Sequence, residues 1–256
     1  MSWWGKLIGG TVGFVLGGPL GALLGASLGH SIDSGRSRNA GHLPGAKERV
    51  QMAFFTATFS VMGHVSKADG KVTREEIDLA ETVMREMSLD ARQRELAKNL
   101  FMQGKAPGFD VNAVLDQFRA ECHRRSTLLQ LFLEVQIEAA FADGRLDGVE
   151  RTVLEQIAAR LRFPTGELDR LIEMIAGMRG GFSGDAPTAD RIDPYAVLGV
   201  TPETPLPEIR KAYRRLMSQH HPDKLVSKGL PEEMIRIANQ KTHEIRKAWK
   251  TIQARH

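Results

Sequence analysis

The chain has 256 residues, of which 42% are hydrophobic, enough for one large core or two smaller ones. A single cysteine, Cys122, excludes an intramolecular disulfide and a cysteine pair for metal or redox chemistry, so a reducing compartment suits most of the chain. The net charge of +4 is unevenly placed, because residues 190–256 carry 13 Lys and Arg against 8 Asp and Glu. This basic C-terminal part favours an acidic partner surface.

An uncharged segment lies close to the N-terminus. Residues 7–29 contain no ionisable side chain, and as a helix they would span about 34 Å, close to the thickness of a bilayer's hydrocarbon core. Trp3 and Trp4 precede the segment, where their amphipathic rings favour the lipid interface. A cleaved signal peptide has a shorter apolar region, and so many glycines would weaken a helix buried in a soluble protein. We therefore predict a transmembrane helix over residues 7–30, after a short segment at 1–6.

Glycine recurs at every fourth position of this segment and forms one helical face. The six glycines are Gly9, Gly13, Gly17, Gly21, Gly25 and Gly29. Such a face lets two helices approach closely in lipid, so it predicts a homodimer through the span. A glycine-rich helix without a partner is the alternative.

The charged flanks predict the orientation of the span. Lys6 is the one basic side chain before it, whereas four follow within about 20 residues: Arg36, Arg38, Lys47 and Arg49. Basic residues are enriched on the cytoplasmic side of membranes, so we expect the N-terminus outside the cytoplasm and the C-terminal domains within it.

After a juxtamembrane linker at residues 31–46, apolar residues recur at helical spacing over 47–178. Two stripes stand out: Phe54, Phe55, Phe59, Val61, Met62 and Val65, and then Leu129, Leu131, Phe132, Val135, Ile137 and Ala140. No convincing alternation of polar and apolar residues appears, so the pattern predicts an all-α protein.

This middle segment contains an internal repeat with a spacing of 74 residues. Residues 68–72, Ala-Asp-Gly-Lys-Val, match residues 142–146, Ala-Asp-Gly-Arg-Leu, and Glu76 matches Glu150. Each copy reads as a long apolar helix, an Asp-Gly turn and an amphipathic helix. One copy alone cannot cover its apolar face, so we expect the two copies to pack together.

Four carboxylates of the repeat are candidate metal ligands: Asp69, Glu76, Asp143 and Glu150. They would converge if the copies pair about a pseudo-twofold axis. Helix capping is the favoured interpretation, because Thr73-x-x-Glu76 and Asp147-x-x-Glu150 are capping boxes and the alternating oxygen ligands of an EF-hand loop are missing. The repeated Ala-Asp-Gly turn followed by a glutamate resembles the TerB-like (tellurite-resistance) helical domains, some of which are metal-associated. A divalent-metal-binding helical protein therefore remains the alternative function.

A Gly- and Pro-containing linker at 179–191 precedes a C-terminal module at 192–256. Asp193 and Pro194 start a short helix, and a second helix follows with an apolar stripe at Ile209, Ala212, Tyr213 and Leu216. Its opposite face carries Arg210, Lys211, Arg214 and Arg215. Pro222 ends this helix, and a third runs from about residue 231 to the end. Its inward-facing residues are predicted to be Met234, Ile237, Ala238, Ile245, Ala248, Trp249 and Ile252. Two antiparallel helices would then hold His221-Pro222-Asp223 at their exposed tip.

This tip is a poor catalytic or metal site. Pro222 fixes the backbone between His221 and Asp223, and neither a nucleophile motif nor a phosphate-binding Gly-x-x-x-x-Gly-Lys loop is present. His220 and His221 are adjacent, so they point apart and make a poor zinc pair. We expect no enzyme activity, no catalytic residue and no cofactor.

The motifs of the module resemble the J domain in order and spacing. They are Pro194-Tyr195-x-x-Leu198-Gly199-Val200, residues 209–216 (Ile-Arg-Lys-Ala-Tyr-Arg-Arg-Leu), His221-Pro222-Asp223-Lys224 and residues 244–249 (Glu-Ile-Arg-Lys-Ala-Trp). With the glycine-rich span and the TerB-like middle, the whole chain is similar to the membrane-anchored DnaJ-like co-chaperones of Gram-negative bacteria. It lacks the Gly/Phe-rich segment and the zinc domain of full-length DnaJ.

The resemblance implies a co-chaperone that stimulates the ATPase of DnaK and recruits it to the bacterial inner membrane, with the short N-terminus in the periplasm. The implied DnaK-binding residues are Arg210, Lys211, Tyr213, Arg214, Arg215, His221, Pro222, Asp223 and Lys224. The middle domain would select a client that the sequence does not identify. Nucleic-acid binding is disfavoured, because no aromatic platform lies beside the arginines.

Overall fold

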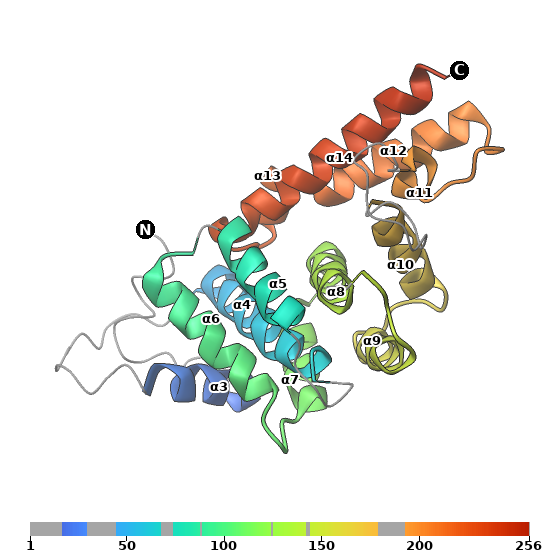
Figure 1. Ribbon diagram of the computed structural model, residues 1–256. Helices are drawn as coiled ribbons and strands as arrows, with labels where there is room; N and C mark the ends of the chain where they lie inside the picture. Colours follow the sequence, from blue (N-terminus) through green and yellow to red (C-terminus); the bar gives the residue numbers. More distant parts are fainter. Residues whose placement is uncertain are drawn as a thin grey trace.

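The computed structural model describes residues 17–29, 45–67, 74–87, 89–123, 125–141, 144–178 and 193–255, and every regular element among them is helical (Figure 1). This confirms the all-α prediction. The N-terminal and middle helices are α3 (Gly18–Gly29), α4 (Ala46–Val65), α5 (Arg74–Glu86), α6 (Ala91–Gly104), α7 (Val111–Glu121), α8 (Ser126–Ala140), α9 (Gly148–Arg160) and α10 (Glu167–Met178). The C-terminal helices are α11 (Pro194–Leu198), α12 (Leu206–His220), α13 (Pro222–Ser227), the 3-10 helix η1 (Glu232–Met234) and α14 (Ile235–Gln253).

Helix α4 is the centre of the middle domain. Almost every residue from Val50 to Val65 is buried, so the predicted stripe is only part of the buried surface of a helix that contacts α3, α6, α7, α8 and α9. Phe54 makes edge contacts with Phe118 of α7 and Phe132 of α8, at ring-centroid distances of 5.8 and 6.4 Å. These aromatic contacts join α4 to both neighbours.

The two predicted copies of the repeat are α4–α5 and α8–α9. Their first helices, α4 and α8, pack against each other, and each second helix contacts the first helix of the other copy. Helices α6 and α7 lie between the copies, and α10 follows the second one; the repeat did not predict these three.

Helix α3 covers part of the predicted membrane segment. It begins at Gly18, and both Gly17 and Gly18 have a φ of +57°, so Gly17 does not continue the helical glycine face as predicted. Glycine adopts this left-handed conformation without a Cβ clash, and Pro19 then fits the first turn. Leu20 and Leu24 are buried in the core, where α3 contacts α6 and α7. No helix within the described ranges is both long and apolar enough to cross a membrane, and residues 7–16, with Gly9 and Gly13, lie outside those ranges.

The C-terminal module is a helical hairpin of α12 and α14, with α11 and α13 packed against α14 (Figure 1). Its core is formed by Ile209, Ala212 and Leu216 of α12 and by Ile237, Ala238, Ile245, Ala248 and Ile252 of α14. The third helix therefore faces inward as predicted. Pro222 follows the end of α12 and also starts α13, a short helix that the sequence pattern does not predict.

The hairpin packs against the middle domain. Helix α11 contacts α10, and α12 contacts α8. A Cβ added to Gly177 of α10 would lie 2.4 Å from Ala196 Cβ of α11, so the glycine permits this close approach. The predicted linker at 179–191 lies outside the described residues.

Candidate functional site

The His-Pro-Asp motif begins helix α13. His221 is the N-cap, and its Nδ1 accepts a hydrogen bond from the backbone N–H of Asp223 at 3.2 Å. Pro222 occupies the first turn, where a missing N–H breaks no helical hydrogen bond and the fixed φ suits the helix. Because Nδ1 is an acceptor, a neutral His221 ring carries its proton on Nε2 and can donate it outward.

The motif is open to solvent. The side chain of Asp223 is 92% exposed and that of His221 is 47% exposed. Lys224 Nζ donates a hydrogen bond to Ser218 Oγ at 2.6 Å, which ties the start of α13 to α12. An exposed carboxylate beside an exposed imidazole, both on a tethered turn, suits contact with another protein rather than chemistry in a pocket.

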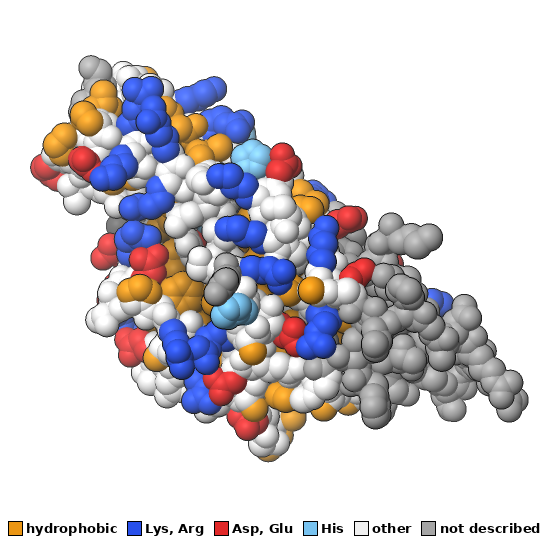
Figure 2. Space-filling model, turned by 180° about the vertical axis from the view of Figure 1, so that it is seen from behind, with side chains coloured by type: hydrophobic (Ala, Val, Ile, Leu, Met, Phe, Trp, Pro, Cys, Tyr) orange, Lys and Arg blue, Asp and Glu red, His pale blue; other side chains and the backbone are white. Residues whose placement is uncertain are grey.

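The basic face of α12 is exposed as predicted. Arg210, Lys211, Arg214 and Arg215 all lie on the surface. Lys211 has a loose ion pair with Glu208 at 3.8 Å, which solvent screening makes weak. Figure 2 shows Lys and Arg gathered over the lobe formed by α11–α14, at the upper left of that view.

Tyr213 lies between the basic face and the hairpin core. Its ring stacks on Trp249 of α14, with centroids 5.2 Å apart and planes inclined by 14°. The residue therefore braces α12 against α14 while part of it remains at the surface.

Of the four candidate metal ligands, Glu150 is the one whose side chain the structure describes. Glu150 belongs to a capping box, in which Asp147 accepts from the N–H groups of Val149 and Glu150 while the Glu150 carboxylate accepts from Asp147 N–H. Asp69 and Asp143 lie outside the described residues, as does the side chain of Glu76. Over the described ranges, no group of three or more His, Cys, Asp or Glu side chains is arranged to hold a metal ion.

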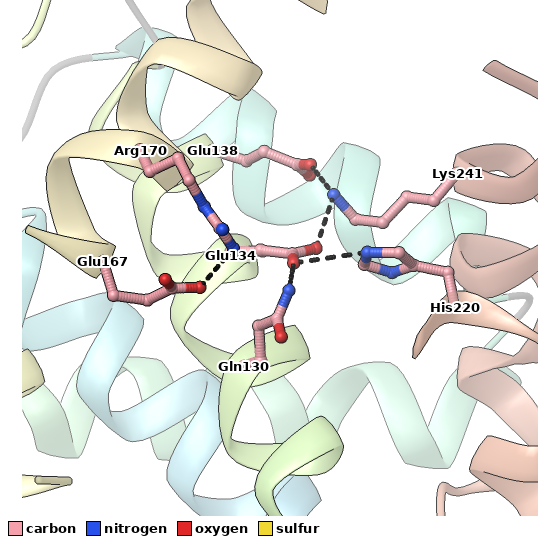
Figure 3. Close-up of polar contacts among 7 residues, drawn as sticks. All are labelled: Gln130, Glu134, Glu138, Glu167, Arg170, His220 and Lys241. Atoms are coloured by element: carbon pink, nitrogen blue, oxygen red, sulfur yellow. Dashed lines mark hydrogen bonds and ion pairs between the residues drawn. The ribbon is translucent and has the colours of Figure 1, made fainter. Parts of the chain in front are cut away.

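A buried charged cluster that the sequence pattern does not predict joins the two domains (Figure 3). Glu134 of α8 is fully buried and accepts a hydrogen bond from Gln130 Nε2 at 2.9 Å. His220 Nε2 lies 3.5 Å from Glu134 Oε1, and Lys241 Nζ lies 3.1 Å from Glu134 Oε2. The Lys241 ammonium also contacts Glu138 at 2.6 Å. The middle domain thus supplies two acids, and the C-terminal module supplies a lysine and a histidine.

Burial and neighbouring charges compete in this cluster. Burial acts to raise the pKa of Glu134, but charge on His220 when it is protonated, the Lys241 ammonium and the Gln130 hydrogen bond lower it overall. Burial acts to lower the pKa of Lys241, but Glu138 and Glu134 raise it overall. For His220 burial outweighs the attraction of Glu134, so its pKa is lowered. At neutral pH an ionised Glu134–Lys241 pair therefore lies beside a neutral His220.

One feature of the sequence did point to this cluster. Glu134 lies between Phe132 and Val135 in the predicted apolar stripe of α8, and a carboxylate buried there requires a partner. The position of that partner, 86 or 107 residues further along the chain, follows only from the packing of the two domains.

Three family models match the chain, each to one of the predicted parts. "Co-chaperone DjlA transmembrane domain" matches residues 1–39, "Tellurite resistance protein TerB" matches 55–172 and "DnaJ domain" matches 193–255. The first match supports the predicted N-terminal membrane anchor, and the other two agree with the resemblances of the middle and C-terminal parts. No solved structure matches the chain.

Curated relatives match over almost the whole length. "Co-chaperone protein DjlA" of Photobacterium profundum is 44% identical, with 97% of each chain covered. The protein of the same name from Escherichia coli K12 is 41% identical over 98% of this chain and 97% of its own, and that of Shewanella oneidensis is 41% identical over 99% and 98%. The exposed His-Pro-Asp turn, the basic helix beside it and these matches together show that the chain belongs to the DjlA family of membrane-anchored, J-domain co-chaperones.

Proposed function

We propose that this co-chaperone stimulates the ATPase of a DnaK-type chaperone and recruits it to the bacterial inner membrane. The observation that carries the proposal is the solvent-exposed His-Pro-Asp turn at the start of α13, presented beside the exposed basic face of α12. A docking surface of this kind acts on the nucleotide-binding site of the partner, so this chain needs no nucleotide-binding site of its own.

The basic face would guide the encounter. Arg210, Lys211, Arg214 and Arg215 present positive charge that attracts an acidic patch on DnaK, which chiefly raises the association rate. The exposed Asp223 carboxylate would then pair with an arginine of the DnaK ATPase domain, a charge-assisted contact that strengthens as water is excluded. His221 adds an outward Nε2–H donor, Lys224 fixes the turn to α12, and Tyr213 braces the helix that carries the charges.

The anchor would place this surface at the membrane. The basic residues that follow the span favour a cytoplasmic location for both folded domains and a periplasmic N-terminus. The four-residue spacing of glycine in the sequence from Gly9 to Gly29 is the basis for proposing that two anchors pair. The middle domain would then bring an as yet unidentified client to DnaK.

Substituting His221→Gln tests the mechanism. We expect the full chain to lose its stimulation of DnaK ATP hydrolysis, because the outward imidazole donor is removed. The far-UV circular dichroism should stay unchanged, because the side chain is half exposed and outside the core. His243→Gln, an exposed substitution on α14, is the matched control and should stimulate like the original chain. Full stimulation by the His221→Gln chain would contradict the proposal.

A further inference from the structure

Two adjacent histidines at the end of α12 have opposite environments. The side chain of His220 is 3% exposed, and its Nε2 lies 3.5 Å from Glu134 Oε1 of the middle domain, a buried contact of an imidazole with a carboxylate that is too long to be a hydrogen bond. The side chain of His221 is 47% exposed and belongs to the docking turn. The two residues share one stretch of backbone, with His221 in an extended conformation at φ −62° and ψ 122°. Any restraint on the His220 ring therefore also restrains the backbone from which the His-Pro-Asp turn starts.

The middle domain also contacts the chain on the far side of the turn. Lys228, the C-cap of α13, donates a hydrogen bond from Nζ to Thr127 Oγ1 of α8. Glu134 contacts His220, just before the motif, and Thr127 contacts Lys228, just after α13. One helix of the middle domain, α8, therefore contacts the chain on both sides of the segment from His221 to Ser227. Nearby, a Cβ added to Gly229 would lie 3.0 Å from a methyl group of Val50, so the chain leaves α13 in close contact with α4.

We infer that Glu134 is a positioning residue for the His-Pro-Asp turn and acts on it through His220. The inference rests on the proposed function for its consequence, since the turn is the surface offered to DnaK, but the restraint itself belongs to this chain alone. The middle domain is then part of the docking device, because it sets the geometry of the turn as well as selecting a client.

Glu134 has the surroundings that this role requires. Its carboxylate is held by Gln130 on its own helix and by Lys241 of α14, which Glu138 holds in turn. Three elements, α8, α12 and α14, therefore meet at one carboxylate (Figure 3). Because the Glu134 carboxylate is already held by several contacts, it loses little conformational entropy when it restrains the His220 ring. Supporting residues of this kind hold a functional turn in one geometry.

The role differs from that of the basic face, and the two predict different kinetic changes. Removing charge from α12 weakens the encounter and raises the chain concentration that gives half-maximal stimulation of DnaK. Loosening the turn leaves the encounter intact and lowers the maximal stimulation. A residue that merely stabilises the fold would change neither quantity while the chain remains folded.

The test uses the full chain in phospholipid nanodiscs, with Glu134→Gln as the variant and Glu95→Gln, exposed on α6, as the matched control. Without DnaK, the amide of Asp223, which donates to His221 Nδ1, should exchange its hydrogen about threefold faster or more in the Glu134→Gln chain. With DnaK and ATP, maximal stimulation should fall by about threefold or more at an unchanged half-maximal concentration. The Glu95→Gln chain should behave like the original in both experiments.

His220→Leu provides a second route to the same answer. Leucine keeps a buried apolar side chain at the position but cannot respond to Glu134, so it should reproduce both changes. Adding Glu134→Gln to it should then have no further effect. If the Glu134→Gln chain does not fold, His220→Leu alone decides by the same two measurements.

The outcomes separate the inference from the proposed function. An Asp223 amide that exchanges at the original rate in both variants would overturn the positioning role, whatever DnaK does. If the original chain fails to stimulate DnaK while exchange still quickens in the variants, the proposed function is wrong and the restraint stands.

Discussion

His220 gives the joint between the domains a dependence on pH. Burial, outweighing the attraction of Glu134, lowers the pKa of its imidazole; Glu138 and Lys241 are the other charged groups that face it. The pKa of a histidine in an unfolded chain is about 6.5, so below that pH the unfolded chain binds a proton that the folded chain does not. The stability contributed by neutral His220 is therefore complete above about pH 6.5 and is lost as the pH falls toward the lower folded pKa.

We predict that acidification from about pH 7.5 to about pH 5.5 lowers the free energy of unfolding through this residue, by at most about 1 kcal/mol because the change begins only below about pH 6.5. Urea unfolding of the full chain in mild detergent, followed by circular dichroism at both pH values, measures the effect. The His220→Gln chain should show a smaller pH dependence. Some dependence should remain, because burial also lowers the pKa of His64. An equal pH dependence in the two chains would contradict the assignment.

Individual residues were predictable where their chemistry is local. Asp147 and Glu150 lie three residues apart and form the expected capping box, and Asp193 caps α11 through Tyr195 N–H at 2.9 Å. The Glu134–His220 and Glu134–Lys241 contacts were not predictable, because neither partner has a local pattern that identifies the other. Gly17 was misplaced for a related reason: spacing alone put it on a helix that begins one residue later.

At the scale of helices, two glycines let α4 and α6 cross at backbone contact. A Cβ added to Gly104 would lie 1.8 Å from the carbonyl oxygen of Ser60, and one added to Gly63 would lie 2.0 Å from that of Phe101. Both obstacles are backbone atoms of the opposite helix, so no side-chain rotation relieves the clash. The pair fixes the crossing point of the two helices.

Gly104→Ala should therefore lower the free energy of unfolding by about 3 kcal/mol, the upper end of the usual range for an overpacked core. Gly148→Ala is the control, because a Cβ there meets nothing within 4 Å and the backbone is helical. We expect the control to change stability by less than about 0.5 kcal/mol. Urea unfolding of both chains in the same buffer measures the difference. Equal stabilities would contradict the prediction, because they would show that α4 and α6 can move apart to admit the added methyl group without loss of folding free energy.

Helices in which apolar residues recur at helical spacing were predictable from the sequence. A short helix such as α13, and the extent to which α4 is buried, were not. The stripes of α8, α12 and α14 matched buried faces, whereas α13 was missed because six residues after a proline carry no periodic signal. Helix α4 gave a stripe but is buried on all sides, since periodicity cannot show how many neighbours a helix has. Helices α6 and α7 pack on α4 without belonging to the repeat.

At the scale of the whole molecule, the two folded domains meet at a joint formed by α8 and α10 of the middle domain and by α11, α12 and α14 of the C-terminal module. Three contacts besides the charged cluster also join the domains: Gly177 against Ala196, Gly229 against Val50, and Lys228 with Thr127. Small residues permit the approach, and the cluster supplies its polar specificity. These contacts therefore determine how the exposed His-Pro-Asp turn and the basic face lie relative to the middle domain.

That arrangement serves DnaK only if both domains lie in the cytoplasm, which labelling of engineered thiols tests. The native Cys122 will not interfere, because it is fully buried and burial raises the pKa of its thiol to about 12. We expect Ser37→Cys, after the span, to react with a membrane-impermeant maleimide only once the cells are opened. Ser2→Cys, before the span, should react in intact spheroplasts. The basic residues that follow the span are the physical reason, since they resist translocation. The opposite pattern would place the docking turn in the periplasm, where it would not meet cytoplasmic DnaK.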